Sequence, residues 1–503
     1  MELALVVVVD LIAIIGLLSL AYSKGGLERA LPFATFLIVL VPIESLVPMG
    51  FFTLTTHRLV IGVLFLLYLI RGNGPGQTEF KSNLPLKGLI FLHVVWCLVA
   101  TTNSIVPEMS VKKLISVVLE YYLLYFIFYK TITKTETVQK ILIGISLAIG
   151  VCSLLGTFEA YQGWNVLDYF PSVGHHFDVG TGGDRQDRVH ATYDHAILFG
   201  AALATAITIS LYLMSVVRRQ SHTVLLWVGL MLMFLNIYKT SSRGPWIDAI
   251  IGCALLMVFG QGRTRKALLC IMALSLAVLI IRPGVWNTIA SLYQNTAGPA
   301  DNATASSYRY RYALQDAAVK RLLEAPIART LEGYGPESFY DVHLEGTLDG
   351  KPHVFLSCDN AWVELLIETG FVGLAIIITI LIIPMFTSLR QCWKLSKPAS
   401  GVSLLLFINF VMCYIQMYSV GMYSWGQNGY VLWILIALTF AHQKLQARLD
   451  TTDGEGSGAS SGAKQTGTPS RIESAWWETV GESCALGQCG SLLANRGALL
   501  VWR

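Results

Sequence analysis

"SCDNAWVELLIETGFVGL", residues 357–374, runs from a polar start straight into an apolar segment that continues to residue 388. The run 361–388 exceeds the roughly 20 residues with which an α-helix crosses a bilayer. It nevertheless begins beside Asp359 and Asn360 and contains Glu364 and Glu368. Because carboxylates are costly in or near a membrane, this stretch predicts a transmembrane helix whose polar end faces an interior cavity or a partner group.

Apolar segments of similar length recur along most of the chain. Of the 503 residues, 54% are hydrophobic and only 14% are charged, which is outside the range of ordinary soluble domains. The sequence therefore predicts an all-α, polytopic transmembrane helical bundle. We expect about thirteen spans of bilayer-crossing length, or about twelve if a weak segment is re-entrant. They lie near 2–22, 30–48, 57–71, 85–102, 113–130, 138–160, 192–215, 223–238, 245–261, 266–282, 361–388, 402–420 and 427–443.

The loops give the predicted orientation. Loops rich in Lys and Arg, such as "VVRRQSH" and "GQGRTRK", alternate with loops that have fewer, and the basic ones are expected on the cytoplasmic side. The chain then divides into N-terminal helices (1–160), central helices (161–282), one long outer loop (283–360), C-terminal helices (361–443) and a cytoplasmic tail (444–503). Within the outer loop, residues 308–326 have apolar residues at helical spacing, and a glycine-rich turn follows. The Gly/Ser/Thr-rich composition after residue 450 predicts disorder in the tail.

Two arginines on the outer face are candidates for binding an anion. Arg243 and Lys239 lie in a short loop, and Pro245 suits the first position of the next helix. A cation just before a helix N-terminus is disfavoured by the helix dipole, whereas free N–H groups plus an arginine suit a phosphate. The alternative is a surface arginine that snorkels to the interface. Arg188 lies at the start of the span near 192–215, where it binds a ligand or pairs with nearby aspartates.

Further charges on the outer face have two interpretations each. Arg309 and Arg311 lie two apart on the predicted helix, so at most one of them points at a common site. Glu364 and Glu368 are four apart and share one helix face. Either Asp359 or Asn360 suits a helix N-cap, which would be a structural role. The alternative is a water-filled outer cavity ringed by arginines and carboxylates.

Nucleotide-dependent chemistry has no recognisable site in the sequence. There is no P-loop and no Rossmann fingerprint, and no cysteine pair has metal-site spacing. An enzyme of this kind must therefore use a donor that is already activated and already in the membrane.

Four segments, in order along the chain, resemble the O-antigen ligases and Wzy-type polysaccharide polymerases of bacterial inner membranes. The resemblance covers roughly residues 185–375. It rests on "DRVHATYDHAILFGAALA" (187–204), "SSRGPWIDAIIG" (241–252), "YRYRYALQDAAVKRLLEAPIARTLEGYGPESF" (308–339) and "DNAWVELLIETGFVG" (359–373). In the last segment, Asp359 stands where the ligases have a histidine.

This resemblance implies a GT-C-like, metal-independent and cofactor-free glycosyltransferase of the inner membrane. Its donor would be an undecaprenyl-pyrophosphate-linked oligosaccharide, and its acceptor a glycan or lipid; membrane lipid and other polysaccharide-export proteins would be further partners, but not nucleic acid. By position, Arg188 and Arg243 would hold the pyrophosphate, and Asp359 would take the acceptor's proton. One of Arg309 or Arg311 would join them at the diphosphate. The further candidate substrate contacts are Lys239, Asn360, Glu364 and His353, and His353 is also the alternative base if the loop folds back.

The aspartate at position 359 favours polymerisation of surface or exopolysaccharide repeat units over ligation of a finished glycan to a lipid. Three alternatives stay open: a ligase, a lipid-linked glycan transporter, and an inactive relative that only binds lipid-linked glycan. A transporter would place charges near the membrane midplane, whereas here they gather on one face.

Overall fold

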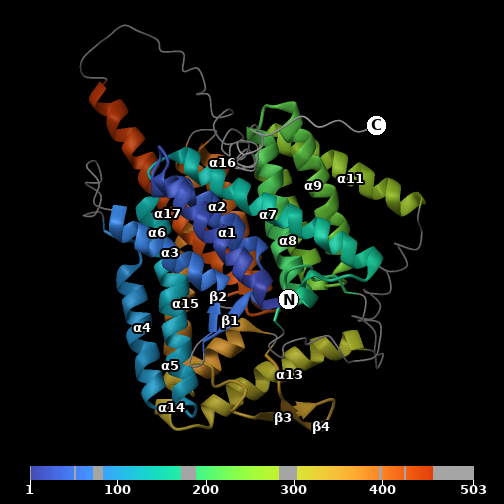
Figure 1. The fold of residues 1–503 in the computed structure, drawn as a ribbon. Coiled ribbons are helices and arrows are strands. Elements are labelled where there is room, and N and C mark those ends of the chain that lie inside the picture. Colours follow the sequence, from blue (N-terminus) through green and yellow to red (C-terminus); the bar gives the residue numbers. More distant parts are fainter. Residues whose placement is uncertain are drawn as a thin grey trace, which may run out of the picture.

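A computed structural model describes residues 2–49, 53–71, 83–171, 188–281, 303–358, 360–395, 399–423 and 426–456. Within these ranges the chain is mostly helical, with two short β-hairpins (Figure 1). The first half contains α1 (Glu2–Tyr22), α2 (Leu27–Leu40), β1 (Leu46–Pro48), β2 (Thr53–Thr55), α3 (Thr56–Arg71), α4 (Lys87–Thr102), α5 (Pro107–Ser116), η2 (Val117–Tyr122), α6 (Leu123–Thr131), α7 (Thr135–Gln162) and η3 (Val166–Tyr169). The second half contains α8 (Ala196–Val216), α9 (Gln220–Lys239), α10 (Arg243–Phe259), α11 (Gly262–Ile281), α13 (Ala303–Leu323), α14 (Ile327–Glu332), β3 (Leu344–Leu348), β4 (Lys351–Phe355), α15 (Ala361–Lys394), α16 (Ala399–Gln416) and α17 (Gly426–Gly456).

Five of the described helices are long and apolar enough to cross a membrane, namely α1, α7, α8, α9 and α15. These five support the prediction of an all-α, multi-pass membrane protein. The remaining predicted spans also coincide with helices, but their membrane crossing stays a prediction. The predicted GT-C-like relation likewise stays a prediction.

Helix α8 is the most deeply buried of the five candidate membrane-spanning helices. Of its most apolar 18-residue window, 94% is buried inside the protein. Its sequence, "AILFGAALATAITISLYLMSV", is apolar on all sides, as expected of a helix surrounded by other helices. It packs against α7, α9, α10, α11 and α16.

A partly buried charge pair connects α3, η2 and α17. Arg58 on α3 donates from Nε to Oε1 of Glu120 at 2.9 Å, and the Tyr430 hydroxyl of α17 donates to the other oxygen of the same carboxylate. Glu120 lies in η2, a π-helical stretch inside the continuous helix formed by α5, η2 and α6. A buried carboxylate needs such partners, because an unpaired buried charge is strongly destabilising.

The boundaries of three predicted segments are corrected by the structure. Helix α2 ends at Leu40, so the predicted span 30–48 is wrong at its C-terminal end; residues 46–48 form β1, which pairs with β2. Pro42 is the physical reason, since the residue before a proline favours extended backbone, as Val41 shows (φ −73°, ψ 133°). Helix α16 ends at Gln416, not at residue 420. Helix α17 continues to Gly456, so the first part of the predicted tail is helical and only residues 457–503 lie outside the described chain.

A small unit with its own core covers one end of the bundle, at the bottom of Figure 1. It comprises α13, α14 and the antiparallel hairpin β3–β4, in which Leu344 pairs with Phe355. The predicted helix within 308–326 is confirmed by α13, and its apolar residues Leu314, Ala318 and Leu322 are all fully buried. They pack with residues of α15, including Ile367. This unit, which we call the outer unit after its predicted side of the membrane, is thereby fixed to the beginning of α15.

Candidate functional site

Helix α15 is broken near its beginning. Gly370 has φ 65° and ψ −171°, so residues 361–369 and 371–394 form two helical segments that meet at a kink. A glycine is required there, because a side chain at this positive φ would be strained and its Cβ would overlap the carbonyl oxygen of Leu331. The break leaves backbone carbonyls without their helical partners, and these need other donors.

The glycine-rich turn after α14 supplies those donors. The backbone N–H groups of Tyr334 and Gly335 donate to the carbonyl oxygens of Ile367 and Glu368, both at 2.9 Å. The indole N–H of Trp96 on α4 donates to Thr369 O, also at 2.9 Å. Gly333 permits this contact, since a Cβ there would lie 2.6 Å from the Glu368 carbonyl. The "EGYGPESF" segment is thus the part of the outer unit that holds the broken helix.

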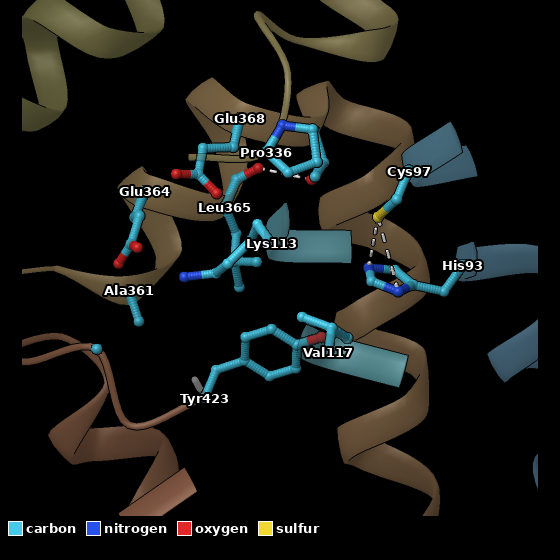
Figure 2. A pocket seen from close by; sticks show the side chains of 12 residues that line it. His93, Cys97, Lys113, Val117, Pro336, Ala361, Glu364, Leu365, Glu368 and Tyr423 are labelled. Carbon is cyan, nitrogen blue, oxygen red and sulfur yellow. Dashed lines mark hydrogen bonds between the residues drawn. The ribbon is translucent and has the colours of Figure 1, made fainter. Parts of the chain in front are cut away.

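The first segment of α15 lines a cavity, which we call the carboxylate cavity (Figure 2). Its volume is about 30 Å³, enough for water. The lining residues come from α4, α5, η2, the turn at 336, α15 and the segment after α16. They are His93, Cys97, Lys113, Val117, Pro336, Ala361, Glu364, Leu365, Glu368, Thr369, Gly421 and Tyr423. The predicted common face of Glu364 and Glu368 is confirmed, because both line this cavity.

Lys113 is the cation of the carboxylate cavity. Figure 2 shows its side chain extending toward Glu364 and Glu368, and its charge interacts with both and with Glu337. Its Nζ forms an ion pair with Glu337 Oε2 at 2.8 Å. Glu337 belongs to the turn that holds α15, so one lysine connects α5, the outer turn and the broken helix. Sequence reasoning missed this lysine, although a charge at the edge of an apolar run was the available signal.

A second cluster lies where α10 begins, and we call it the arginine region: Arg188, Thr240, Ser242 and Arg243. Arg188 donates from Nε to Thr240 O at 2.9 Å and from Nη2 to Ser242 Oγ at 2.5 Å. Ser242 is the residue before α10, and Arg243 is the first residue of the helix. The two predicted arginines are therefore brought to one helix N-terminus from separate loops.

The start of α10 differs in register from the prediction. Pro245 was expected at the first helical position with Arg243 before the helix, but the helix begins at Arg243 and Pro245 is its third residue. The ring of Pro245 instead packs against Gly200 of α8, where a Cβ would lie 2.7 Å away. The conclusion about the dipole is unchanged, since Arg243 still lies within the first turn.

The segment 416–423 lies between the two clusters. At one end, Gln416 and Ser419 pack against Gly244 of α10. At the other, Gly421 and Tyr423 line the carboxylate cavity. In between, Met417 O accepts a hydrogen bond from the backbone N–H of Ala361 at 2.9 Å, which fixes the beginning of α15. The arginine region and the carboxylate cavity are thus neighbours along one short stretch of chain.

Other residues predicted for the site lie elsewhere. Arg309 forms an ion pair with Asp349 of the β3–β4 turn at 3.0 Å, and Arg311 is half-buried on the same helix, α13. His353 on β4 packs edge-on against Tyr310 and Phe355. Lys239 ends α9, and its ammonium lies 5.2 Å from the centre of the Tyr161 ring.

The predicted N-cap of α15 is Asn360. Its Oδ1 accepts hydrogen bonds from the backbone N–H groups of Trp362 and Val363, at 3.0 and 3.3 Å. Asp359, the predicted proton acceptor, lies outside the described residues, and its role stays a prediction.

Comparison with known families gives one match, to the family model described as O-antigen ligase, over residues 228–378. This match supports an O-antigen ligase-like family for this part of the chain. The match runs from α9 into α15, so it contains Arg243, the outer unit and the kink at Gly370. No curated protein matches the chain. Arg188 and Lys113 precede the O-antigen ligase segment, yet the fold brings both to it.

Proposed function

We propose that the protein is an inner-membrane glycosyltransferase of this family. It would transfer a glycan from a polyprenyl-pyrophosphate carrier to an acceptor hydroxyl at the periplasmic face, polymerising repeat units of a surface or exported polysaccharide. Attachment of a finished glycan to a lipid is the second candidate, favoured by the description of the matched family as O-antigen ligase.

The observation that carries the proposal is the arginine region. Arg188 donates hydrogen bonds to Thr240 O and Ser242 Oγ, and Ser242 directly precedes Arg243 at the start of α10. Two guanidinium groups at a helix N-terminus suit a diphosphate, because the free N–H groups and the dipole favour negative charge and guanidinium binds phosphate oxygens in pairs. As the sugar–phosphate bond breaks, charge develops on the diphosphate, and these groups would stabilise it.

In this proposal, a carboxylate near the N-terminus of α15 accepts the proton of the acceptor hydroxyl. Asp359 has the position that the family resemblance assigns to this role. Its sequence neighbour Asn360 is the N-cap of α15, and the next residue is hydrogen-bonded to Met417. Met417 belongs to the segment between the arginine region and the carboxylate cavity. Glu364 would contact the acceptor from inside that cavity.

The test is a substitution of Arg243 by Ala in a deletion strain. We expect loss of glycan transfer with normal membrane insertion, and Arg243→Lys should restore little, since an ammonium cannot bind phosphate in the same forked geometry. Arg390→Ala, near the opposite end of α15, is the matched control and should transfer normally. Normal product from well-expressed Arg243→Ala protein would exclude the proposed pyrophosphate site.

The products distinguish the two candidate reactions. If transfer-deficient cells accumulate single repeat units on the lipid carrier, the protein is a polymerase. If full-length chains accumulate on the carrier, it is a ligase.

A further inference from the structure

Gln416 is a buried glutamine at the end of α16. It is 1% exposed, and neither Oε1 nor Nε2 has a partner among the residues that the structure describes. Buried polar groups are normally satisfied, because leaving one unpaired is destabilising. Packing alone therefore does not explain why a glutamine, and not an apolar residue, occupies this buried position.

The position of Gln416 points to a ligand. It is the last residue of α16, and a Cβ on Gly244 would lie 3.3 Å from its Oε1 and 3.5 Å from its Nε2. Gly244 directly follows Arg243 in the first turn of α10. Gly244 and Ser419, which border the amide, are only half-buried. The free amide thus adjoins the N-terminus at which the arginine region gathers.

A second unpaired amide group lies at the next helix N-terminus. Asn360 is fully buried, and its Oδ1 caps α15, but its Nδ2 has no partner within the described part of the chain. Asn360 immediately precedes Ala361. The backbone N–H of Ala361 donates a hydrogen bond to the carbonyl oxygen of Met417, the residue after Gln416. Two buried side chains therefore leave two donors, Nε2 and Nδ2, and one acceptor, Oε1, unused in the same part of the molecule.

The combination of donors and an acceptor selects the ligand chemistry. A phosphate oxygen accepts hydrogen bonds and could satisfy Nε2 and Nδ2, but it has no proton for Oε1. An acyl chain satisfies none of them. A sugar hydroxyl both donates and accepts, so it can satisfy Oε1 and Nε2 together.

We infer that Gln416, with Asn360, binds hydroxyl groups of the sugar next to the diphosphate that the arginine region holds. This inference rests on the proposed function and adds the residues that would recognise the sugar of the donor. Gly244 would be part of the same subsite, because the missing side chain leaves the amide open toward the N-terminus of α10.

Binding to purified full-length protein tests the inference with two probes: a polyprenyl diphosphate without sugar and the same lipid carrying one sugar. Wild type should bind the sugar-bearing lipid more tightly. Gln416→Leu should remove about 10-fold of that preference, the size of one or two neutral hydrogen bonds. It should leave affinity for the bare lipid unchanged, with an equal or higher Tm, because an unpaired amide is replaced by an apolar group of similar size.

Two further variants separate the possible causes. Gly244→Ala should also lose the sugar preference while α10 stays folded, since Ala favours a helix over Gly. Gln391→Leu is the matched control, because Gln391 is another buried glutamine with an unpaired Nε2, near the far end of α15, and it should keep the preference.

The outcomes separate this inference from the proposed function. If Gln416→Leu retains the preference for the sugar-bearing lipid, or lowers the affinity for both probes equally, the sugar subsite is excluded. If Arg243→Ala leaves binding of both probes unchanged, the proposed pyrophosphate site fails, whatever Gln416 does.

Discussion

Glu44 lies in the connection between α2 and β1, and its carboxyl is largely withdrawn from water. Burial, with a smaller contribution from the nearby charge of Asp194, raises the pKa of Glu44 from 4.5 to about 7. The folded protein then keeps a proton that the unfolded chain releases. The contribution of protonated Glu44 to the free energy of unfolding is therefore fully present below about pH 4.5 and is lost as the pH rises to about 7.

We predict that Glu44→Gln stabilises the protein above pH 7, by on the order of 1–3 kcal/mol. Below pH 4.5 the variant and wild type should unfold alike, because both side chains are then neutral. Thermal unfolding in detergent across this range measures the effect. Glu324→Gln, at an exposed carboxylate, is the control; an equal response of both variants would contradict the prediction.

At the scale of single residues, the sequence identified the groups that stand out against their surroundings. Arg188 and Arg243 were found because cations are unusual at an outer helix start, and Glu364 because carboxylates are unusual in an apolar run. Lys113 and Gln416 were missed, since each lies in a segment with no family motif. Their significance comes from contacts with residues far away in the chain, such as Glu337 and Gly244.

At the scale of elements, most helices could be located from hydropathy alone, but the break in α15 could not. A glycine inside an apolar helix is common, and nothing local distinguishes Gly370. The kink exists because the turn at 333–335 donates hydrogen bonds to the freed carbonyls. The β3–β4 hairpin was also not predicted, as its short strands, "LEGTL" and "KPHVF", lack strict alternation.

The Gly370 kink gives a prediction with a matched control. Gly370→Ala should cost more than about 4 kcal/mol, because backbone strain and overlap with Leu331 act together. Gly350→Ala, at φ 76° with no neighbour within 4 Å, isolates the strain and should cost only about 1–2 kcal/mol. Chemical denaturation of both variants measures the difference, and equal costs would show that the close backbone contact is unimportant.

The ion pair between Lys113 and Glu337 is the second feature at this scale. Lys113→Met leaves three carboxylates without their cation. We expect it to destabilise the protein by on the order of 1–3 kcal/mol. This is less than the cost for a fully buried pair, since the Glu337 side chain is 35% exposed. Adding Glu337→Gln should recover part of the loss, because it removes one uncompensated charge. A double-mutant cycle measures the coupling, and additive effects would show that the two groups do not interact.

At the scale of the whole molecule, the predicted orientation places the outer unit and the tail on opposite sides of the membrane. We expect a cysteine at exposed Lys351 to react with an impermeant thiol reagent in intact cells, in a background free of native cysteines. A cysteine at exposed Arg448 on α17 should react only after the membrane is opened. The reverse pattern would invert the topology and move the arginine region to the cytoplasmic face.

The dependence of α15 on the glycine-rich turn has a consequence for biogenesis. Carbonyls freed by the kink need donors, because unpaired backbone groups are costly away from water. Synthesis from the N-terminus delivers residues 333–335 before residues 361–369. The half-helix therefore meets its donors as soon as it is made. A circular permutant that begins after the turn would reverse this order, and we expect it to insert poorly although its finished fold has the same contacts.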